Sequence, residues 1–166
     1  VIVERKQGCR SSNAFEVIST RLSTQFSNNI RNNRGFLTRC EDRPENDPAL
    51  LFYQEGRKVF KEVTTLVSNL LSEHLGENEL DPASVRCMWL HQANQSMNTL
   101  IAKRLLGREA TEEEAPNILE QYANTSSAGS IIAFHQHQSH LKAGDLGVIC
   151  SFGAGYSIGS VLVRKL

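Results

Sequence analysis

Amphipathic helical stretches alternate with short apolar runs along this chain, and this alternation constrains the fold more than any other feature. Val85–Leu90, Leu146–Phe152 and Ser157–Val163 are apolar runs of strand length. Leu51–Leu75 and Gln95–Leu106 carry apolar residues at the i, i+3, i+4, i+7 spacing of a helix. The resulting order, β-α-β-α-α-β-β, predicts a layered α/β domain.

Weaker signals predict the remaining elements. Val1–Glu4 and Phe15–Thr20 have the composition of strands. The small residues that open Ser126–Leu141 favour a helix packed closely at its start. Thr111 followed by three glutamates is typical of a helix N-cap with an acidic first turn, and Asp81–Ser84 suggests a capped turn before the strand at Val85.

One long polar connection, Ser23–Pro48, interrupts this pattern. It is rich in Asn and Arg, with isolated large apolar residues such as Phe26 and Ile30. A connection of this length inside a compact domain is usually functional or disordered. The apolar residues argue against a plain linker, so we expect this loop to contribute one wall of a substrate pocket.

The composition limits the partners and the compartment. The chain has 166 residues, the size of one domain, and its 18 Lys and Arg residues balance 18 Asp and Glu residues. No overall field favours nucleic acid, and no run approaches the roughly 18 apolar residues of a membrane-spanning helix. Without a C-x-x-C pair or a signal peptide, we expect reduced thiols and a cytoplasmic protein. The four cysteines are Cys9, Cys40, Cys87 and Cys150.

Two motifs at the ends of predicted elements carry the chemistry. His91 follows a buried strand in the run His-Gln-Ala-Asn, and Asn124 follows 33 residues later, before the small-residue helix. A histidine alone at such a place is often structural, and an asparagine before a helix is often an N-cap. An imidazole and a carboxamide can, however, both donate to one carbonyl oxygen, as a developing enolate requires. The ordered pair therefore favours an oxyanion-stabilising site.

The glycine-rich segment Phe152-Gly153-Ala154-Gly155 allows two interpretations. It can be a hairpin turn between two strands, or it can place a backbone N–H at an active centre, because glycine permits close approach. A strand rather than a helix follows, so it is not a dinucleotide-binding fingerprint.

The histidines of the predicted last helix do not form a metal site. On a helix, His135, His137 and His140 point in different directions, so they cannot share one ion. We expect no metal.

Basic residues on or near the helices that flank the His91 loop form either a solvated face or a docking surface for an acidic protein or a phosphate. They are Arg57, Lys58, Lys61, Lys103, Arg104 and Arg108.

The segments HQAN, YANTSSAGS and SFGAGYSIGSVLVRK resemble, in this order, the C-terminal half of the β-ketoacyl-[acyl-carrier-protein] synthases III of the thiolase superfamily. The likeness runs from about Gly56 to the C-terminus and extends less specifically to Val1. The run from Phe26 to Asn33 resembles the bacterial subgroup primed by medium-chain acyl-CoA, the β-ketodecanoyl-ACP synthases. The resemblance implies one half of a five-layered α-β-α-β-α fold. The whole chain, 1–166, would be the C-terminal half-domain, and the nucleophilic cysteine would lie in a missing N-terminal half.

The same resemblance implies the decarboxylative condensation of an acyl-CoA primer with malonyl-ACP in fatty acid biosynthesis. His91 and Asn124 would complete a Cys-His-Asn triad, with acyl-CoA and malonyl-ACP as substrates and no cofactor. The implied partners are acyl carrier protein, the missing half and a second copy in a homodimer. We expect this chain by itself to be inactive.

Further site residues follow from the resemblance, position by position. Two departures bear on them: Ser96 stands where a short-chain branch of the family has an arginine, and Ala154 stands where a glycine is frequent. The implied oxyanion and gate residues are Phe152, Gly153 and Ala154. The implied CoA and pantetheine residues are Gly56, Arg57, Phe60, Ala93 and Asn94. The implied carrier-docking residues are Lys61, Lys103 and Arg104.

Two alternatives remain open. The chain could belong to another condensing enzyme of the superfamily, of hydroxymethylglutaryl-CoA synthase or polyketide type. It could instead be a non-catalytic half that supports a dimer or docks carrier protein, although the presence of both His91 and Asn124 argues against this. A thiolase is disfavoured because its glycine-rich motif holds a second catalytic cysteine, whereas Cys150 lies in the preceding strand.

Overall fold

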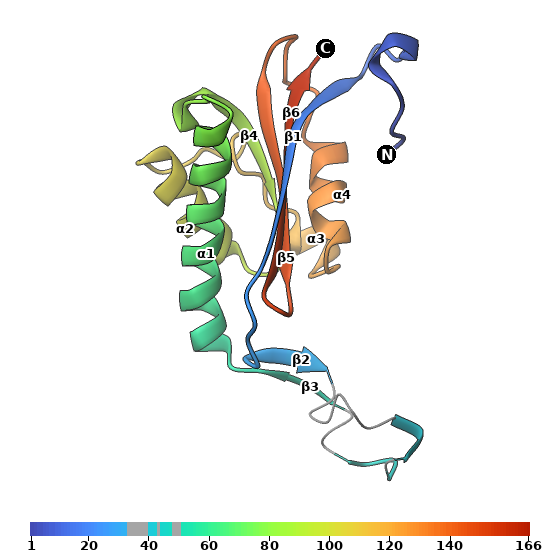
Figure 1. Cartoon of the computed structure of the whole chain (residues 1–166), viewed down its shortest axis with the longest axis vertical. Helices are drawn as coiled ribbons and strands as arrows, with labels where there is room; N and C mark the ends of the chain where they lie inside the picture. The colour runs from blue at the N-terminus through green and yellow to red at the C-terminus, as the bar shows by residue number, and fades with distance from the viewer. Residues whose placement is uncertain (33–39, 43, 48–50) are drawn as a thin grey trace.

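The computed structural model describes residues 1–32, 40–42, 44–47 and 51–166. Its main body has three layers, a four-stranded sheet with helices on both faces (Figure 1). The main strands are β1 (Phe15–Thr24), β4 (Val85–Leu90), β5 (Leu146–Gly153) and β6 (Ser157–Lys165). The helices are α1 (Gly56–Glu77), α2 (Gln95–Leu106), α3 (Leu119–Tyr122) and α4 (Ala128–Gln136). The strands β2 (Ile30–Asn32) and β3 (Phe52–Gln54) form a separate two-stranded sheet, and short 3₁₀ turns are η1 (Lys6–Gly8), η2 (Cys40–Asp42) and η4 (Pro82–Ser84).

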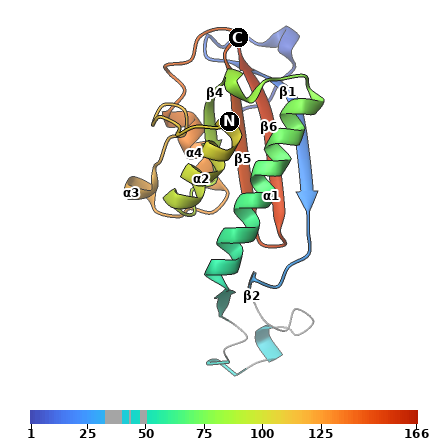
Figure 2. The same cartoon turned by 90° about the vertical axis from the view of Figure 1, so that its left-hand side faces the viewer.

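The strand order of the main sheet is β1-β6-β5-β4. Only the β4–β5 pair is parallel, since α2, α3 and α4 carry the chain back between these two strands. Helices α1 and α2 cover one face and α4 lies on the other, as the two views show (Figures 1 and 2). The α/β layering predicted from the alternation is therefore confirmed, and β4 and α2 have the predicted bounds. Of the helices in the described part of the chain, none combines the length and the hydrophobicity needed to cross a membrane.

Successive side chains of β4 point into two different cores, because side chains of a strand alternate between its faces. Met88 and Leu90 are buried in the larger core, which α1 and α2 cover. Cys87 and Trp89 belong to the smaller core beneath α4. Burial on both faces explains why the β4 sequence does not alternate and is apolar at every position except the exposed Arg86.

Trp89 organises the core beneath α4. Its ring makes edge-on contacts with Phe134 and Phe15, at centroid separations of 4.8 and 6.1 Å. Its Nε1 donates to the carbonyl oxygen of His137 at 2.9 Å. Gly147 on β5 leaves room for the ring, because a Cβ at this position would lie 2.4 Å from Trp89 Cζ3.

One predicted element near the N-terminal side is wrong in the structure, and the start of a second is displaced. Val1–Glu4 is not a strand, because these exposed residues pair with no neighbouring strand in the described part of the chain. The helix predicted over Leu51–Leu75 begins only at Gly56 and continues to Glu77. Phe52–Gln54 instead pairs with Ile30–Asn32, in keeping with the preference of aromatic residues for strands.

Two further boundaries differ for local reasons. Thr111 and Glu114 exchange the hydrogen bonds of a capping box, but only a turn follows, since Pro116 cannot continue a helix. The helix predicted over Ser126–Leu141 spans only Ala128–Gln136. It ends where the carbonyl of the next residue, His137, is engaged by Trp89.

The predicted long connection, Ser23–Pro48, is partly ordered into strands. Strand β1 continues to Thr24, and Ile30–Asn32 forms β2. Residues 33–39, 43 and 48 of this connection lie outside the described residues.

His74, near the end of α1, is a buried polar bridge between that helix and the sheet. Its Nδ1 lies 3.0 Å from Ser160 Oγ on β6, and its Nε2 lies 3.0 Å from Ser19 Oγ on β1. Burial, and next the nearby Arg21 guanidinium, hold the pKa of His74 below its usual 6.5, while Glu77 opposes the shift.

This lowered pKa predicts acid sensitivity. Below pH 6.5 the unfolded chain takes up a proton at His74 more readily than the folded chain. We therefore expect the His74 contribution to the free energy of unfolding to be complete above this pH and to be lost progressively below it. Urea denaturation at several pH values from about 5 to 7.5 should show a flatter profile for His74→Gln. The exposed control His135→Gln should keep the wild-type slope, and equal slopes in all three proteins would contradict the assignment.

Candidate active site

The parallel strands β4 and β5 end at the same edge of the sheet, and each delivers one side chain there. His91 follows the last residue of β4, and Phe152 is near the end of β5. Their rings lie 4.7 Å apart between centroids, at an interplanar angle of 58°. Carboxyl ends of neighbouring parallel strands are a common place for catalytic groups in α/β proteins.

Burial favours the uncharged form of the His91 imidazole. The residue is 7% exposed, and burial lowers the pKa of its ring from 6.5. Its Nδ1 is buried and has no hydrogen-bond partner among the described residues. A neutral imidazole keeps one N–H donor and one acceptor, so His91 can donate to a ligand oxygen without carrying a charge.

Asn124 sits in a strained loop rather than at a helix cap. Its Oδ1 accepts from the Ser126 backbone N–H at 2.9 Å, whereas the N-cap position of α4 belongs to Ser127. Ala123 and Ser126, on either side, have φ values of 55° and 57°, which is costly for residues other than glycine. The Oδ1 contact leaves the amide NH₂ of Asn124 as the donor.

A cavity of about 650 Å³ brings these groups together. His91 and Asn124 both line it, although they come from different loops. The predicted oxyanion and gate residues Phe152, Gly153 and Ala154 line the same cavity. Four of the five predicted CoA and pantetheine residues do so as well: Gly56, Phe60, Ala93 and Asn94.

Arg57 is the exception among the predicted cavity residues. It is exposed on the first turn of α1 and does not line the cavity, although its neighbour Gly56 does. On a helix, adjacent residues point about 100° apart, so sequence adjacency to Gly56 does not bring Arg57 to the wall.

Asn94 has a structural role in addition to its place in the cavity wall. Its Oδ1 caps α2 by accepting from the backbone N–H groups of Ser96, at 2.9 Å, and Met97, at 3.4 Å. This geometry fixes the amide and leaves its NH₂ group for other contacts.

Several further residues of the cavity wall were not singled out as site residues from the sequence, although the long polar connection was expected to contribute to a pocket. Ile30 and Arg31 reach it from β2, within the long polar connection, and Arg31 stacks on Tyr53 with its Cζ 4.2 Å from the ring centroid. Tyr156 lies in the glycine-rich turn and donates to Glu62 of α1 at 2.8 Å. The remaining unpredicted lining residues are Phe52, Gln54, Val59, Val63, Met97 and Ser126.

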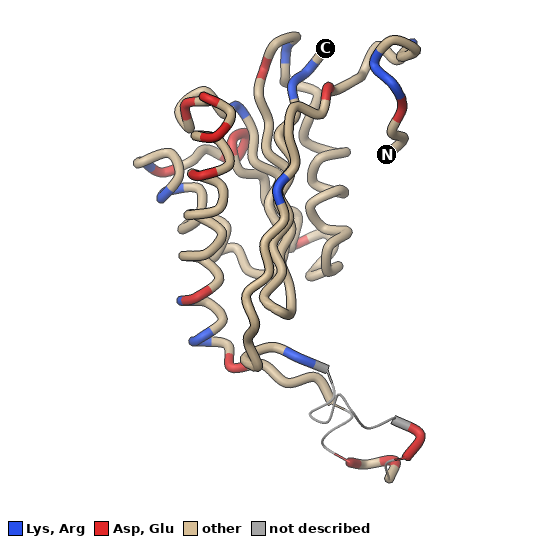
Figure 3. The backbone as a smooth tube through the Cα atoms, in the orientation of Figure 1, with Lys and Arg blue, Asp and Glu red and all other residues tan. Residues whose placement is uncertain are grey.

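The predicted docking cations lie on the outer layer, away from the cavity. Lys61 is exposed on α1, and Lys103 and Arg104 are exposed in the last turn of α2. Basic and acidic positions are interspersed along the backbone (Figure 3). Arg104 bridges the helices, because its Nη1 lies 3.3 Å from the hydroxyl oxygens of both Thr64 and Thr65. Lys103 pairs with Glu109.

The described cysteines do not supply a nucleophile to this cavity. Cys87 and Cys150 are buried, and desolvation raises the pKa of each thiol to about 12. Cys9 is a free thiol in the N-terminal segment and does not line the cavity. Within the described residues, no group of three or more His, Cys, Asp or Glu side chains could hold a metal ion.

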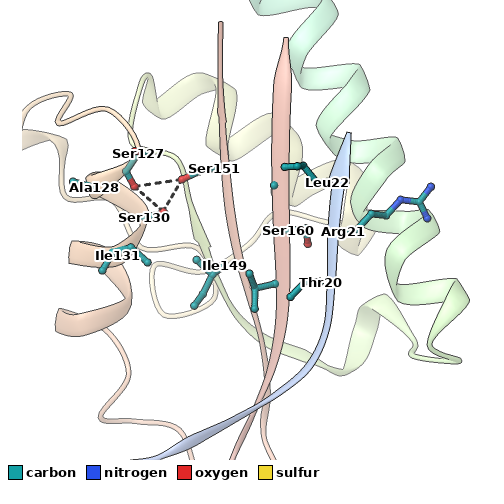
Figure 4. Close-up of a pocket in the computed structure, with 12 residues that line it drawn as sticks. Thr20, Arg21, Leu22, Ser127, Ala128, Ser130, Ile131, Ile149, Ser151 and Ser160 are labelled. Carbon is teal, nitrogen blue, oxygen red and sulfur yellow. Dashed lines mark hydrogen bonds between the residues drawn. The ribbon is translucent and has the colours of Figure 1, made fainter. Parts of the chain in front are cut away.

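A second hollow, of about 540 Å³, lies beside α4 on the same face of the sheet (Figure 4). Ile131 of α4 and Ile149 of β5 form one side, and Thr20 and Leu22 of β1 form the other. Leu22 is 79% exposed and Ile131 is 41% exposed. Helix α4 thus covers only part of this face.

A three-layered α/β unit with an imidazole and a carboxamide lining one cavity has the architecture of the C-terminal half of a thiolase-like enzyme. A family profile described as 3-oxoacyl-[acyl-carrier-protein (ACP)] synthase III C terminal matches residues 75–165. The chain therefore belongs to the 3-oxoacyl-[acyl-carrier-protein] synthase III family, as a C-terminal part.

Curated relatives agree with this assignment. The chain is 58% identical over 165 residues to a Pseudomonas aeruginosa β-ketodecanoyl-[acyl-carrier-protein] synthase, covering 99% of this chain and 47% of the relative. It is 35% identical over 112 residues to a Bacteroides thetaiotaomicron β-ketoacyl-[acyl-carrier-protein] synthase III, covering 68% of this chain and 32% of that protein. The chain thus spans half or less of the length of these relatives.

Solved structures show the same fold. A 3-oxoacyl-[acyl-carrier-protein] synthase III from Aquifex aeolicus matches with a TM-score of 0.74 at 23% identity, over 97% of this chain and 52% of that one. The synthase III from Thermus thermophilus gives a TM-score of 0.68 at 21% identity, over 93% and 47% of the two chains.

Proposed function

We propose that this chain is the His/Asn half of an enzyme that condenses an acyl-CoA primer with malonyl-ACP in fatty acid biosynthesis. The observation that carries the proposal is that His91 and Asn124, from different loops, line one cavity. Two neutral donors aimed at one oxygen stabilise an enolate without protonating it.

The proposed reaction has two stages. A cysteine thiolate of the absent half attacks the acyl-CoA thioester and releases CoA, leaving an acyl-cysteine. Malonyl-ACP then loses CO₂, and the electron pair of the broken C–C bond forms an enolate whose oxygen accepts hydrogen bonds from His91 and Asn124. The enolate carbon attacks the acyl-cysteine carbonyl, the cysteine sulfur leaves and is protonated, and β-ketoacyl-ACP is the product. The backbone at Ala154 would help to hold the oxyanion of this second attack.

The hollow beside α4 supports the proposal that a second half completes the fold. It exposes apolar side chains, Leu22 and Ile131 among them, on a sheet face that α4 covers incompletely. An apolar face of this kind is normally covered by another structural layer. We propose that the N-terminal half packs here and carries its cysteine to the cavity.

The primer is proposed to be a medium-chain acyl-CoA. The 58% identical relative is a β-ketodecanoyl-[acyl-carrier-protein] synthase. The segment that suggests this subgroup also contributes to the cavity, through Ile30 and Arg31. The acyl chain would extend from the cavity into the absent half.

The full-length protein containing this chain tests the proposal. With malonyl-ACP and acyl-CoA primers from two to twelve or so carbons, we expect β-ketoacyl-ACP and CO₂, with the highest kcat/KM for medium chains. A hybrid joining the N-terminal half of the Pseudomonas relative to residues 1–166 should behave alike, and the isolated chain should be inactive. A full-length protein that releases neither product would exclude the proposed activity.

Carrier docking gives a separate prediction. Lys61→Glu combined with Lys103→Glu should raise the KM for malonyl-ACP by about tenfold, because reversed charges repel an acidic partner. The KM for acyl-CoA should change little, and Lys142→Glu, an exposed cation after α4, is the matched control. Arg104 is left in place because it also joins α1 to α2. Steady-state kinetics at low salt check the prediction, and an equal effect on both substrates would contradict it.

A further inference from the structure

Gln92, next to His91, is a fully buried amide with all its hydrogen bonds inside the chain. It is 0% exposed. Its Nε2 donates to the carbonyl oxygens of Leu90, at 3.0 Å, and Pro116, at 3.2 Å. Its Oε1 accepts from the Ile118 N–H at 3.1 Å. One side chain therefore joins the end of β4 to the loop before α3.

The aliphatic part of Gln92 also sets how closely α4 approaches. A Cβ built on Gly129, in the first turn of α4, would lie 2.8 Å from Gln92 Cβ and 3.1 Å from its Cγ. It would also lie 3.3 Å from the hydroxyl oxygen of Thr125, the residue after Asn124. Gln92 is thus in close packing with the segment that carries the second donor.

His91 has little other support for its orientation. Its Nδ1 has no partner in the described part of the chain, and its ring packs on Phe152 without a polar contact. The position of the imidazole then depends on the backbone of His91. The side chain of the next residue, Gln92, fixes this backbone through its hydrogen bonds to Leu90, Pro116 and Ile118. Buried and fully satisfied polar groups hold a backbone rigidly.

We propose that Gln92 is a positioning residue that fixes the His91 imidazole relative to the Asn124 amide. It makes no contact with the reacting atoms and acts through the backbone of His91 on one side and the start of α4 on the other. This inference rests on the proposed condensing activity for its kinetic consequence. Its geometric consequence, a displaced His91 ring, is independent of activity.

The first test is Gln92→Leu in the full-length protein. Leucine keeps the volume but removes three hydrogen bonds, so we expect the kcat of condensation to fall about 10²-fold, as for a misplacement of 1 Å or so. Acyl transfer from acyl-CoA should stay within about twofold. The matched control is Gln95→Leu, the same change at an exposed position. Wild-type condensation, or equal losses in both half-reactions, would overturn the proposal.

Two further variants decide the matter even if Gln92→Leu does not fold. The methyl group added by Gly129→Ala would clash with the Gln92 side chain and displace it, without leaving a buried polar group unpaired. This variant should therefore reproduce the selective loss of condensation. Gln92→Glu introduces a carboxyl that can donate one hydrogen bond only when protonated. Its condensation rate should therefore fall with rising pH while acyl transfer does not. Full condensation in Gly129→Ala together with a wild-type pH profile in Gln92→Glu would overturn the proposal.

Crystal structures of the same variants separate this inference from the proposed function. We expect the His91 ring to leave its place 4.7 Å from the Phe152 ring in Gln92→Leu and to keep it in Gln95→Leu. If the wild-type protein does not condense its substrates, the proposed function fails, but the displaced ring still supports the positioning role. An undisplaced ring would overturn that role whatever the activity.

Discussion

His91→Ala and Asn124→Ala should each lower the rate of condensation about 10²–10³-fold, because each removes one donor from the proposed enolate oxygen. Acyl transfer from acyl-CoA to the cysteine should persist, since that step requires neither donor in the proposed scheme. Both side chains line one cavity, so the double variant should lose less than the sum of the two effects. Single-turnover assays of acyl-enzyme formation and CO₂ release measure the two stages separately.

Matched controls separate chemistry from loop structure. Asn117 is exposed, and its Oδ1 accepts from the Leu119 N–H at 3.2 Å, much as Asn124 accepts from Ser126. Asn117→Ala therefore removes the same kind of turn bond away from the cavity, and His135→Ala removes an exposed imidazole. Both controls should condense at wild-type rates. Wild-type rates in His91→Ala and Asn124→Ala as well would exclude the proposed triad.

Trp89→Ala should lower the free energy of unfolding by about 3–5 kcal/mol, the usual cost of truncating a large core aromatic. The ring is 0% exposed, meets Phe15 and Phe134 edge-on, and donates to the His137 carbonyl. The truncation leaves a cavity where the Trp89 ring was. The neighbouring residues can fill little of it, because Gly147, beneath the ring, has no side chain.

Urea denaturation of the full-length protein measures this effect. Trp89→Phe keeps most of the packing and loses mainly the hydrogen bond to His137, so its cost should be smaller, about 1–3 kcal/mol. Tyr122→Ala, which truncates a 41% exposed aromatic, is the control and should stay within about 1 kcal/mol of wild type. A loss below about 1 kcal/mol for Trp89→Ala would show that the core beneath α4 does not stabilise this half.

Local sequence patterns predicted the helices and strands in which buried residues recur at the spacing of the element or fill it almost completely. The β4 run is apolar at every position except the exposed Arg86, because its other residues are buried on both faces, and α2 is capped by Gly107, whose φ of 69° suits glycine. Prediction failed where pairing decides the structure. Val1–Val3 is apolar but has no strand partner among the described residues, and Phe52–Gln54 continues the helical spacing but pairs with β2.

In the candidate site, too, some residues could be predicted from local sequence patterns and others could not. His91 and Asn124 could be predicted because each lies where a regular element begins or ends, and the resemblance named them as a pair. Arg57 does not line the cavity, because a sequence position beside Gly56 does not say which way a helical side chain points, and its role in CoA binding stays a prediction. Gln92 was overlooked as a positioning residue, since its three partners lie two to 26 residues away and only the fold brings them together.

The amino-acid sequence by itself determined the α/β layers and the ends of β4 and α2, and it indicated the candidate residues His91 and Asn124, because these depend on periodicity and on residue type over short distances. The tertiary structure alone decided that His91 and Asn124 share a cavity, which residues complete its wall, and which face of the sheet remains open beside α4. These features arise from packing between segments that are far apart along the chain. No local pattern encodes such distances.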